Sequence, residues 1–143
     1  MARILRTLVA LVLLVVPTVG LVASTSTSAS AAPTYGPWSS EVVGLQGRVS
    51  PPSAKQPRAY LQFRRTQSSE GDRQVRMAYR IGDRKRVTLP ARSLAPGDRT
   101  QFRSARVPCG KRVVVIAQGR YRMDSSASWT KWYSVSARFT RSC

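Results

Sequence analysis

The feature that most constrains the fold is a pair of strand-like segments near the C-terminus, residues 111–123 and 129–141. The first contains the apolar run 113–117, and in the second apolar side chains recur at every second position from Tyr133 to Phe139; both patterns are typical of β-strands. Only five polar residues, 124–128, separate them, and a loop of this length is typical of a β-hairpin. In the register that pairs Val113 with Phe139, small inward side chains oppose large ones. The segments therefore predict one long antiparallel hairpin.

The two cysteines agree with this register, because it places Cys109 opposite Cys143. Two cysteines in an exported protein usually form one disulfide, and closing a loop of about 35 residues would stabilise the fold by roughly 4 kcal/mol. Thiol catalysis would need a C-x-x-C motif or a reactive thiol beside a base, and the sequence around these cysteines has neither. We therefore predict a structural Cys109–Cys143 disulfide.

The rest of the chain after residue 58 also shows strand periodicity and no convincing helical period. Residues 32–58 are rich in Pro, Gly and Ser and contain one weak strand candidate, 41–49. The further strands that the pattern predicts are 59–65, 74–81, 87–89 and 100–107. We expect an all-β fold: a small antiparallel β-sandwich or barrel of about six or seven strands, with immunoglobulin-like or Greek-key-like connections.

The same alternation separates an inward face from an outward face. Tyr133 and Val135 fall on the inward face of the hairpin, so we expect both to be buried and Trp132 to point away from the core. The predicted inward set is Leu61, Phe63, Val75, Met77, Tyr79, Ile81, Val113, Val115, Ala117, Tyr133, Val135 and Phe139.

Residues 1–31 have the layout of a secretory signal peptide. Arg3 and Arg6 precede an apolar run over residues 7–23, and an A-x-A cleavage site follows. We place the cut after Ala31, so that Ala32 becomes the mature N-terminus. The alternative is an uncleaved membrane anchor, but the run is shorter than the roughly 20 apolar residues of a spanning helix.

Secretion would leave an extracellular chain of residues 32–143 without a transmembrane segment. We expect residues 32–58 to be an N-terminal arm and residues 59–143 to be the β domain. The two parts together should form one folded unit, because 112 residues is the size of a single domain.

Positive charge dominates the composition. The sequence has 24 Lys and Arg against 6 Asp and Glu, and loss of Arg3 and Arg6 lowers the net charge from +18 to +16. Such a surplus attracts polyanions, although a positive surface kept for solubility is the alternative. The arginines at outward strand positions would form a broad basic face if they shared one sheet: Arg48, Arg58, Arg64, Arg76, Arg80, Arg120, Arg122 and Arg138.

Within this set the hairpin and its neighbouring strand give the candidate polyanion-binding site: Arg76, Arg80, Arg120, Arg122 and Trp132. The arginines would supply charge, and an outward Trp132 flanked by arginines would stack on a base or sugar ring. The alternative is an ordinary Trp132 covered by the second sheet or by the arm. The partners we expect are anionic wall polymers or the cell surface, acidic glycans, and nucleic acid without sequence specificity.

Enzyme chemistry lacks its usual parts in this sequence. There is no His, and none of the six carboxylates lies in an apolar stretch that would raise its pKa. No cluster of His and Cys offers metal ligands, and we expect no cofactor. The alternative function is a secreted protein-binding module, such as a protease or hydrolase inhibitor. Its loops would be 125–129 or 90–99, with Arg92 or Arg99 entering an acidic pocket of the partner.

Overall fold

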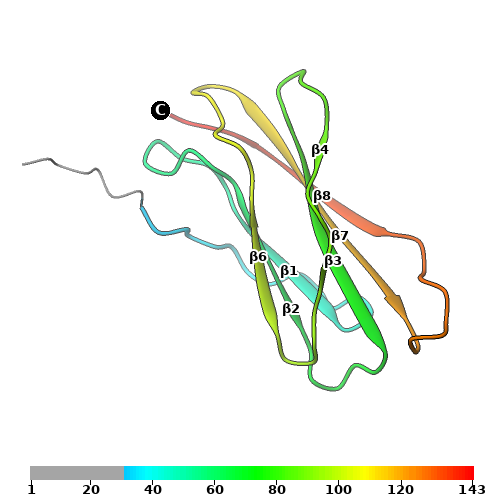
Figure 1. Cartoon of the computed structure of the whole chain (residues 1–143). Helices are drawn as coiled ribbons and strands as arrows, with labels where there is room; N and C mark the ends of the chain where they lie inside the picture. The colour runs from blue at the N-terminus through cyan, green and yellow to red at the C-terminus, as the bar shows by residue number, and fades with distance from the viewer. Residues whose placement is uncertain (1–30) are drawn as a thin grey trace, which may run out of the picture.

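A computed structural model describes residues 31–143, which form a sandwich of two antiparallel β-sheets (Figure 1). Sheet A has the order β1-β2-β6, with bounds Leu45–Ser50, Tyr60–Arg65 and Arg99–Arg103. Sheet B has the order β4-β3-β7-β8, and the short β5 also pairs with β3; the bounds are Asp72–Ile81 (β3), Val87–Thr88 (β4), Arg92–Ser93 (β5), Arg112–Arg122 (β7) and Tyr133–Thr140 (β8). The predicted all-β sandwich is confirmed.

The chain crosses between the two sheets after β2, after β5 and after β6. This is the Greek-key-like connectivity of immunoglobulin-like sandwiches. The weak strand candidate 41–49 corresponds to β1, which pairs with β2 along its whole length, so part of the predicted arm is built into sheet A. Apart from Ala31, the predicted signal peptide lies outside the described residues. Residues 31–143 contain no helix long and apolar enough to cross a membrane.

The C-terminal hairpin has the predicted register and the predicted disulfide. Val113 pairs with Phe139, the ladder runs to Gly119 opposite Tyr133, and Cys109 is bonded to Cys143. However, β8 begins at Tyr133 rather than at residue 129. The reason lies at Thr130, whose N–H donates to the Tyr121 carbonyl while its hydroxyl accepts from the Tyr121 N–H. A side-chain oxygen thus replaces a backbone carbonyl, and the regular ladder stops.

Most of the predicted inward set forms the core between the sheets. Eight of its members are buried: Leu61, Phe63, Val75, Met77, Tyr79, Ile81, Val113 and Val115. Ala117 and Phe139 are partly buried against them. The core also takes in five residues that the predicted inward set left out: Leu45, Ala59, Leu94, Phe102 and Val107.

The predicted burial of Tyr133 and Val135 is wrong. Their side chains are 48% and 67% exposed, although both line the inner side of the hairpin as expected. Sheet A is narrower than sheet B, and its edge strand β1 packs on β7: a Cβ at Gly119 would lie 2.8 Å from Leu45 Cδ1. Strand β8 therefore extends beyond the covering sheet, and its inner face stays open.

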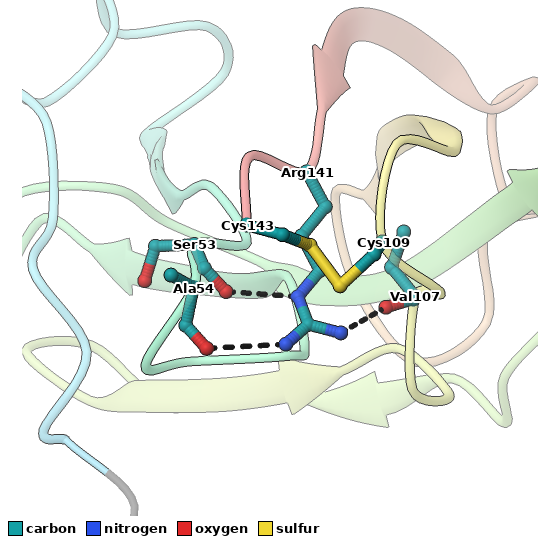
Figure 2. The surroundings of a disulfide bond; sticks show 6 residues. All are labelled: Ser53, Ala54, Val107, Cys109, Arg141 and Cys143. Carbon is teal, nitrogen blue, oxygen red and sulfur yellow. Dashed lines mark hydrogen bonds between the residues drawn. A yellow bond between two sulfur atoms is a disulfide. The ribbon is translucent and has the colours of Figure 1, made fainter.

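Arg141 links the end of β8 to two distant segments beside the disulfide (Figure 2). Its side chain is 6% exposed, and its guanidinium donates hydrogen bonds of 2.9, 3.1 and 2.8 Å to the carbonyls of Ser53, Ala54 and Val107. The carbonyls replace the carboxylate partner that a buried arginine usually has. One side chain thus ties the β1–β2 connection and the segment before Cys109 to the C-terminus.

The open inner face of β8 predicts a clear ranking of two substitutions. Tyr133→Ala should cost about 1 kcal/mol because the ring is half exposed, whereas Met77→Ala, at a fully buried position, should cost about 2–5 kcal/mol. Guanidinium unfolding of the two variants followed by far-UV circular dichroism measures both values. The opposite ranking would mean that another part of the chain covers Tyr133.

Arg141 gives a second prediction. Arg141→Lys keeps the charge but replaces a planar fork by one ammonium, so it should leave at least one of the three carbonyls without a donor. We expect a loss of about 2–3 kcal/mol in the free energy of unfolding, measured with the disulfide oxidised. Arg138→Lys, at an exposed position of the preceding strand β8, is the control and should have almost no effect.

Candidate polyanion-binding site

Each outer face of the sandwich carries the same arrangement of two Gln-x-Arg segments on neighbouring antiparallel strands. On sheet B, Gln74 and Arg76 of β3 face Arg120 and Gln118 of β7, so that each Gln stands opposite an Arg. We call these four residues cross B. The alternation of strands directs both residues of a Gln-x-Arg segment to the same face, and the antiparallel register turns two such segments into a reciprocal pair.

The glutamines of cross B hold the arginines by their side-chain oxygens. Arg76 Nε donates to Gln118 Oε1 at 2.8 Å, and Arg120 donates to Gln74 Oε1 through Nε at 3.0 Å and Nη2 at 2.7 Å. The amide nitrogen of Gln118 continues to Ser134 Oγ on β8 at 2.8 Å. Because glutamine is a neutral acceptor, these bonds fix the guanidiniums without cancelling their charge.

Two tryptophans of the hairpin lie against the arginines of cross B. The guanidinium carbons of Arg76 and Arg120 lie 4.0 and 4.4 Å from the centre of the Trp132 ring. Arg120 also lies 4.9 Å from the Trp129 ring centre. Arg122 follows at 4.7 Å from Trp129. Arginines and tryptophans therefore alternate along this face, and cation–π attraction holds the guanidiniums against the rings.

Sheet A repeats the arrangement on the opposite side of the molecule. Gln46 and Arg48 of β1 face Arg64 and Gln62 of β2, and we call these four residues cross A. Arg48 Nε donates to Gln62 Oε1 at 2.8 Å, and Arg64 Nε donates to Gln46 Oε1 at 2.7 Å. In each of the four Arg–Gln pairs of the two crosses, the arginine Nε thus donates to the glutamine Oε1.

The segment before β1 supplies the aromatic rings of cross A. Trp38 lies 4.4 Å from the Arg48 guanidinium and 4.2 Å from that of Arg64, and Tyr35 lies 4.7 Å from Arg48. Backbone bonds from Gly36 N–H to the Val49 carbonyl and from Ser39 N–H to the Gly47 carbonyl run this segment along the edge of β1. Burial of the Tyr35 phenol is the main cause that raises its pKa.

The structure brings Arg76, Arg120 and Trp132 together, as the sequence predicts, and Trp132 does point outward. Its ring already contacts two guanidiniums of the chain itself. Arg122 lies beside them but is paired with Asp72 at 2.6 Å, the one ion pair within residues 31–143. Arg80 is on the same face of β3, four residues from Arg76 and thus about 13 Å along the strand.

The arginines do not share one sheet, so they do not form the single broad basic face that a shared sheet would have given. Arg48 and Arg64 belong to sheet A, whereas Arg76, Arg120 and Arg138 belong to sheet B, so the two groups lie on opposite outer faces. Arg58 is in neither group, because its Nη1 donates to the Ser104 carbonyl in the connection after β6. Alternation along a strand shows which side chains point away from the core, but it does not show to which sheet the strand belongs.

Cross A was not predicted from the sequence, although the sequence contains a pattern that indicates it. Six of the seven glutamines in the chain are followed two residues later by arginine. Four of these Gln-x-Arg segments build the two crosses. A repeated polar pair at strand spacing is therefore the pattern that would have revealed both clusters, and the partnering of Trp38 follows only from the fold.

The guanidiniums of Arg76 and Arg120 in cross B are bonded to neutral glutamines and not to carboxylates. Burial against the sheet is the main cause that lowers the pKa of Arg76, and the neighbouring Arg86 and Arg120 lower it further. No carboxylate accepts a hydrogen bond from either cross in the described part of the chain. An anion bound here would meet guanidiniums that are positioned in advance and still carry full charge.

The chain matches no protein-family model, no curated protein and no solved structure. Within residues 31–143 no three His, Cys, Asp or Glu side chains come close enough to hold a metal ion.

The Trp132 contacts predict a measurable contribution to stability. Trp132→Ala removes two cation–π contacts and should lower the free energy of unfolding by about 2 kcal/mol. Trp132→Phe keeps a weaker ring and should lose less than half of that amount. Denaturant unfolding followed by far-UV circular dichroism measures both. An unchanged midpoint in Trp132→Ala would show that the ring does not hold the arginines.

Proposed function

We propose that the protein is a secreted, non-enzymatic module that binds anionic polymers through arginine faces on both sides of a β-sandwich. The polymers that fit best carry phosphate groups, because guanidinium matches the oxygens of a phosphate in a bidentate geometry. Anionic wall polymers and extracellular nucleic acid belong to this class, and recognition through phosphate carries no base specificity.

The observation that carries the proposal is the choice of glutamine where ion pairing would call for glutamate. Glu and Gln have nearly the same shape, and either oxygen would accept the Arg Nε hydrogen bond. In both crosses the neutral residue is present, so the four arginines are held in place and keep their charge. A carboxylate would hold the arginines at least equally well but would neutralise them.

The hydrogen-bond geometry leaves donors for a ligand. Arg48, Arg64 and Arg76 use Nε toward glutamine, and within residues 31–143 their Nη atoms have no acceptor. The two Nη groups of a guanidinium form the edge that binds an anion end-on. We assign Trp132, Trp129 and Trp38 to orienting these side chains, which reduces the entropy that binding would otherwise cost.

The geometry gives less support to the inhibitor alternative. Arg92 would have to project from its loop, but its Nη1 donates to Thr100 Oγ1 at 2.9 Å and to the Gln101 carbonyl at 2.8 Å. Its guanidinium also lies 4.5 Å from the Phe102 ring. Arg99 stands in strand β6 and not at the tip of a loop.

The test changes charge while it preserves shape. In the double variant Gln74→Glu and Gln118→Glu, the carboxylates should pair with Arg120 and Arg76 and neutralise cross B. Binding of a DNA duplex and of a purified glycerol-phosphate polymer is titrated at several salt concentrations. We expect affinity to fall about 10-fold, and the slope of log affinity against log salt to fall by about 2 for DNA. The free energy of unfolding should stay equal or rise slightly.

The matched control is the double variant Gln67→Glu and Ser68→Glu, which makes the same change in net charge in an exposed loop. It should bind as the wild type does, apart from a small general effect of charge. If both double variants lose the same affinity, the positive charge acts without a site. If the wild type binds neither polymer at low salt, the proposed function is wrong.

A further inference from the structure

An apolar groove opens along the side of the sandwich where sheet A is too narrow to cover sheet B. Its volume is 470 Å³, and its floor and walls include Leu45, Val43, Ala117, Tyr133 and Val135. Val42, at the rim, is 46% exposed. Exposed side chains of this size gathered in one concave surface are unusual on a chain with so much charge, and they indicate a binding surface.

The outer boundary of this groove is the free edge of β8. In the β7–β8 ladder, Arg141 N–H donates to the Lys111 carbonyl, so hydrogen-bonded pairs alternate from that position along the strand. The backbone groups of Tyr133, Val135, Ala137 and Phe139 then point to β7. Those of Ser134, Ser136 and Arg138 point away from it, and no strand within residues 31–143 pairs with them.

The other sheet edges are protected. The segment with Gly36 and Ser39 bonds to the edge of β1, and the two-residue strands β4 and β5 cover β3. At β6, which is five residues long, the Arg92 side chain bonds to the Gln101 carbonyl. Strand β8 is eight residues long, contains no Pro and has apolar residues on its inner side. Proteins usually blunt such an edge, so an open one is a place for strand addition.

Charge decides which strand fits. A second copy of the chain would bring another large positive charge, since the sequence has 24 basic and 6 acidic residues. A strand added beside β8 places alternate side chains in the groove and the others on the outer face. The groove side is apolar, and the outer side lies next to Arg138. The complementary strand therefore alternates apolar and acidic residues.

We propose that β8 is a docking edge for an extended segment of a partner protein in which apolar and acidic residues alternate. The segment would extend sheet B by one strand, with main-chain hydrogen bonds to Ser134, Ser136 and Arg138. Its apolar side chains would cover Val135 and Tyr133, and its acidic side chains would lie along the outer face. This proposal does not rest on polyanion binding, because the main-chain groups of the β8 edge are distinct from the guanidiniums of the two crosses. The surfaces adjoin, since Gln46 and Arg48 also line the groove and β8 belongs to the same sheet as cross B.

The probe is a blocked seven-residue peptide of alternating glutamate and valine that begins and ends with glutamate. Binding to residues 32–143 is followed by nitrogen–proton NMR and by fluorescence anisotropy of a labelled copy. We expect amide shifts concentrated at Ser134, Ser136 and Arg138. The same peptide with lysine in place of glutamate should bind at least 10-fold more weakly.

Ser136→Pro is the decisive variant. It removes an N–H that points away from β7, a position where an edge strand tolerates proline, and it leaves every arginine in place. Peptide affinity should fall at least 10-fold, while DNA binding should stay unchanged. Val135→Asn, which puts an uncharged polar group in the groove at an exposed position, should weaken binding in the same direction and serves if Ser136→Pro does not fold.

Three results would overturn the proposal. Equal peptide binding by wild type and both variants would mean that the glutamates bind the arginine faces by charge alone. No binding of the peptide by the wild type would remove the docking edge. A dimer in sedimentation velocity that Ser136→Pro abolishes would identify a second copy of the chain, and not an acidic partner segment, as the occupant of the edge.

Discussion

The hydrogen bond from an arginine Nε to a glutamine side-chain oxygen is the interaction on which both faces of the sandwich depend. It occurs four times, twice on each sheet, at distances between 2.7 and 3.0 Å. A chain with 24 basic and only 6 acidic residues lacks enough carboxylates to pair its arginines. A neutral acceptor resolves this shortage, because it fixes the direction of the guanidinium and does not cancel its charge. Aromatic rings then hold the flat face of the same group.

The buried arginines meet the shortage in a different way. Arg65 and Arg141 are each less than 10% exposed, and their guanidiniums donate mainly to backbone carbonyls. Burial, followed by repulsion from Arg73, lowers the pKa of Arg65, and Asp72 opposes that shift. Every buried side-chain nitrogen and oxygen in residues 31–143 has a hydrogen-bond partner. Loop carbonyls thus serve as the internal counter-charges, and the loops they belong to are fixed in return.

The hairpin was predictable from the sequence because a period of two, a short loop and a cysteine at each end fix one register. The inward parity of Tyr133 was predictable for the same reason. Its exposure was not, because burial of β8 depends on the width of the opposite sheet, which no local pattern encodes. The division of the arginines between two sheets was missed for a related reason. Face follows from alternation along one strand, whereas sheet membership follows from crossovers between strands.

The unequal width of the two sheets connects the failed prediction to the chemistry of the molecule. A further strand of sheet A packed over β8 would bury Val135 and close the groove. If it also paired with β8, it would remove the only long unprotected edge in residues 31–143. The arginine crosses lie on the outer faces of the two sheets, and Gln46 and Arg48 of cross A also line the groove. Cationic outer faces and an apolar lateral edge thus adjoin in one small domain. A strand on the edge would use main-chain atoms of β8, whereas a polymer on the faces would use the guanidiniums of the two crosses.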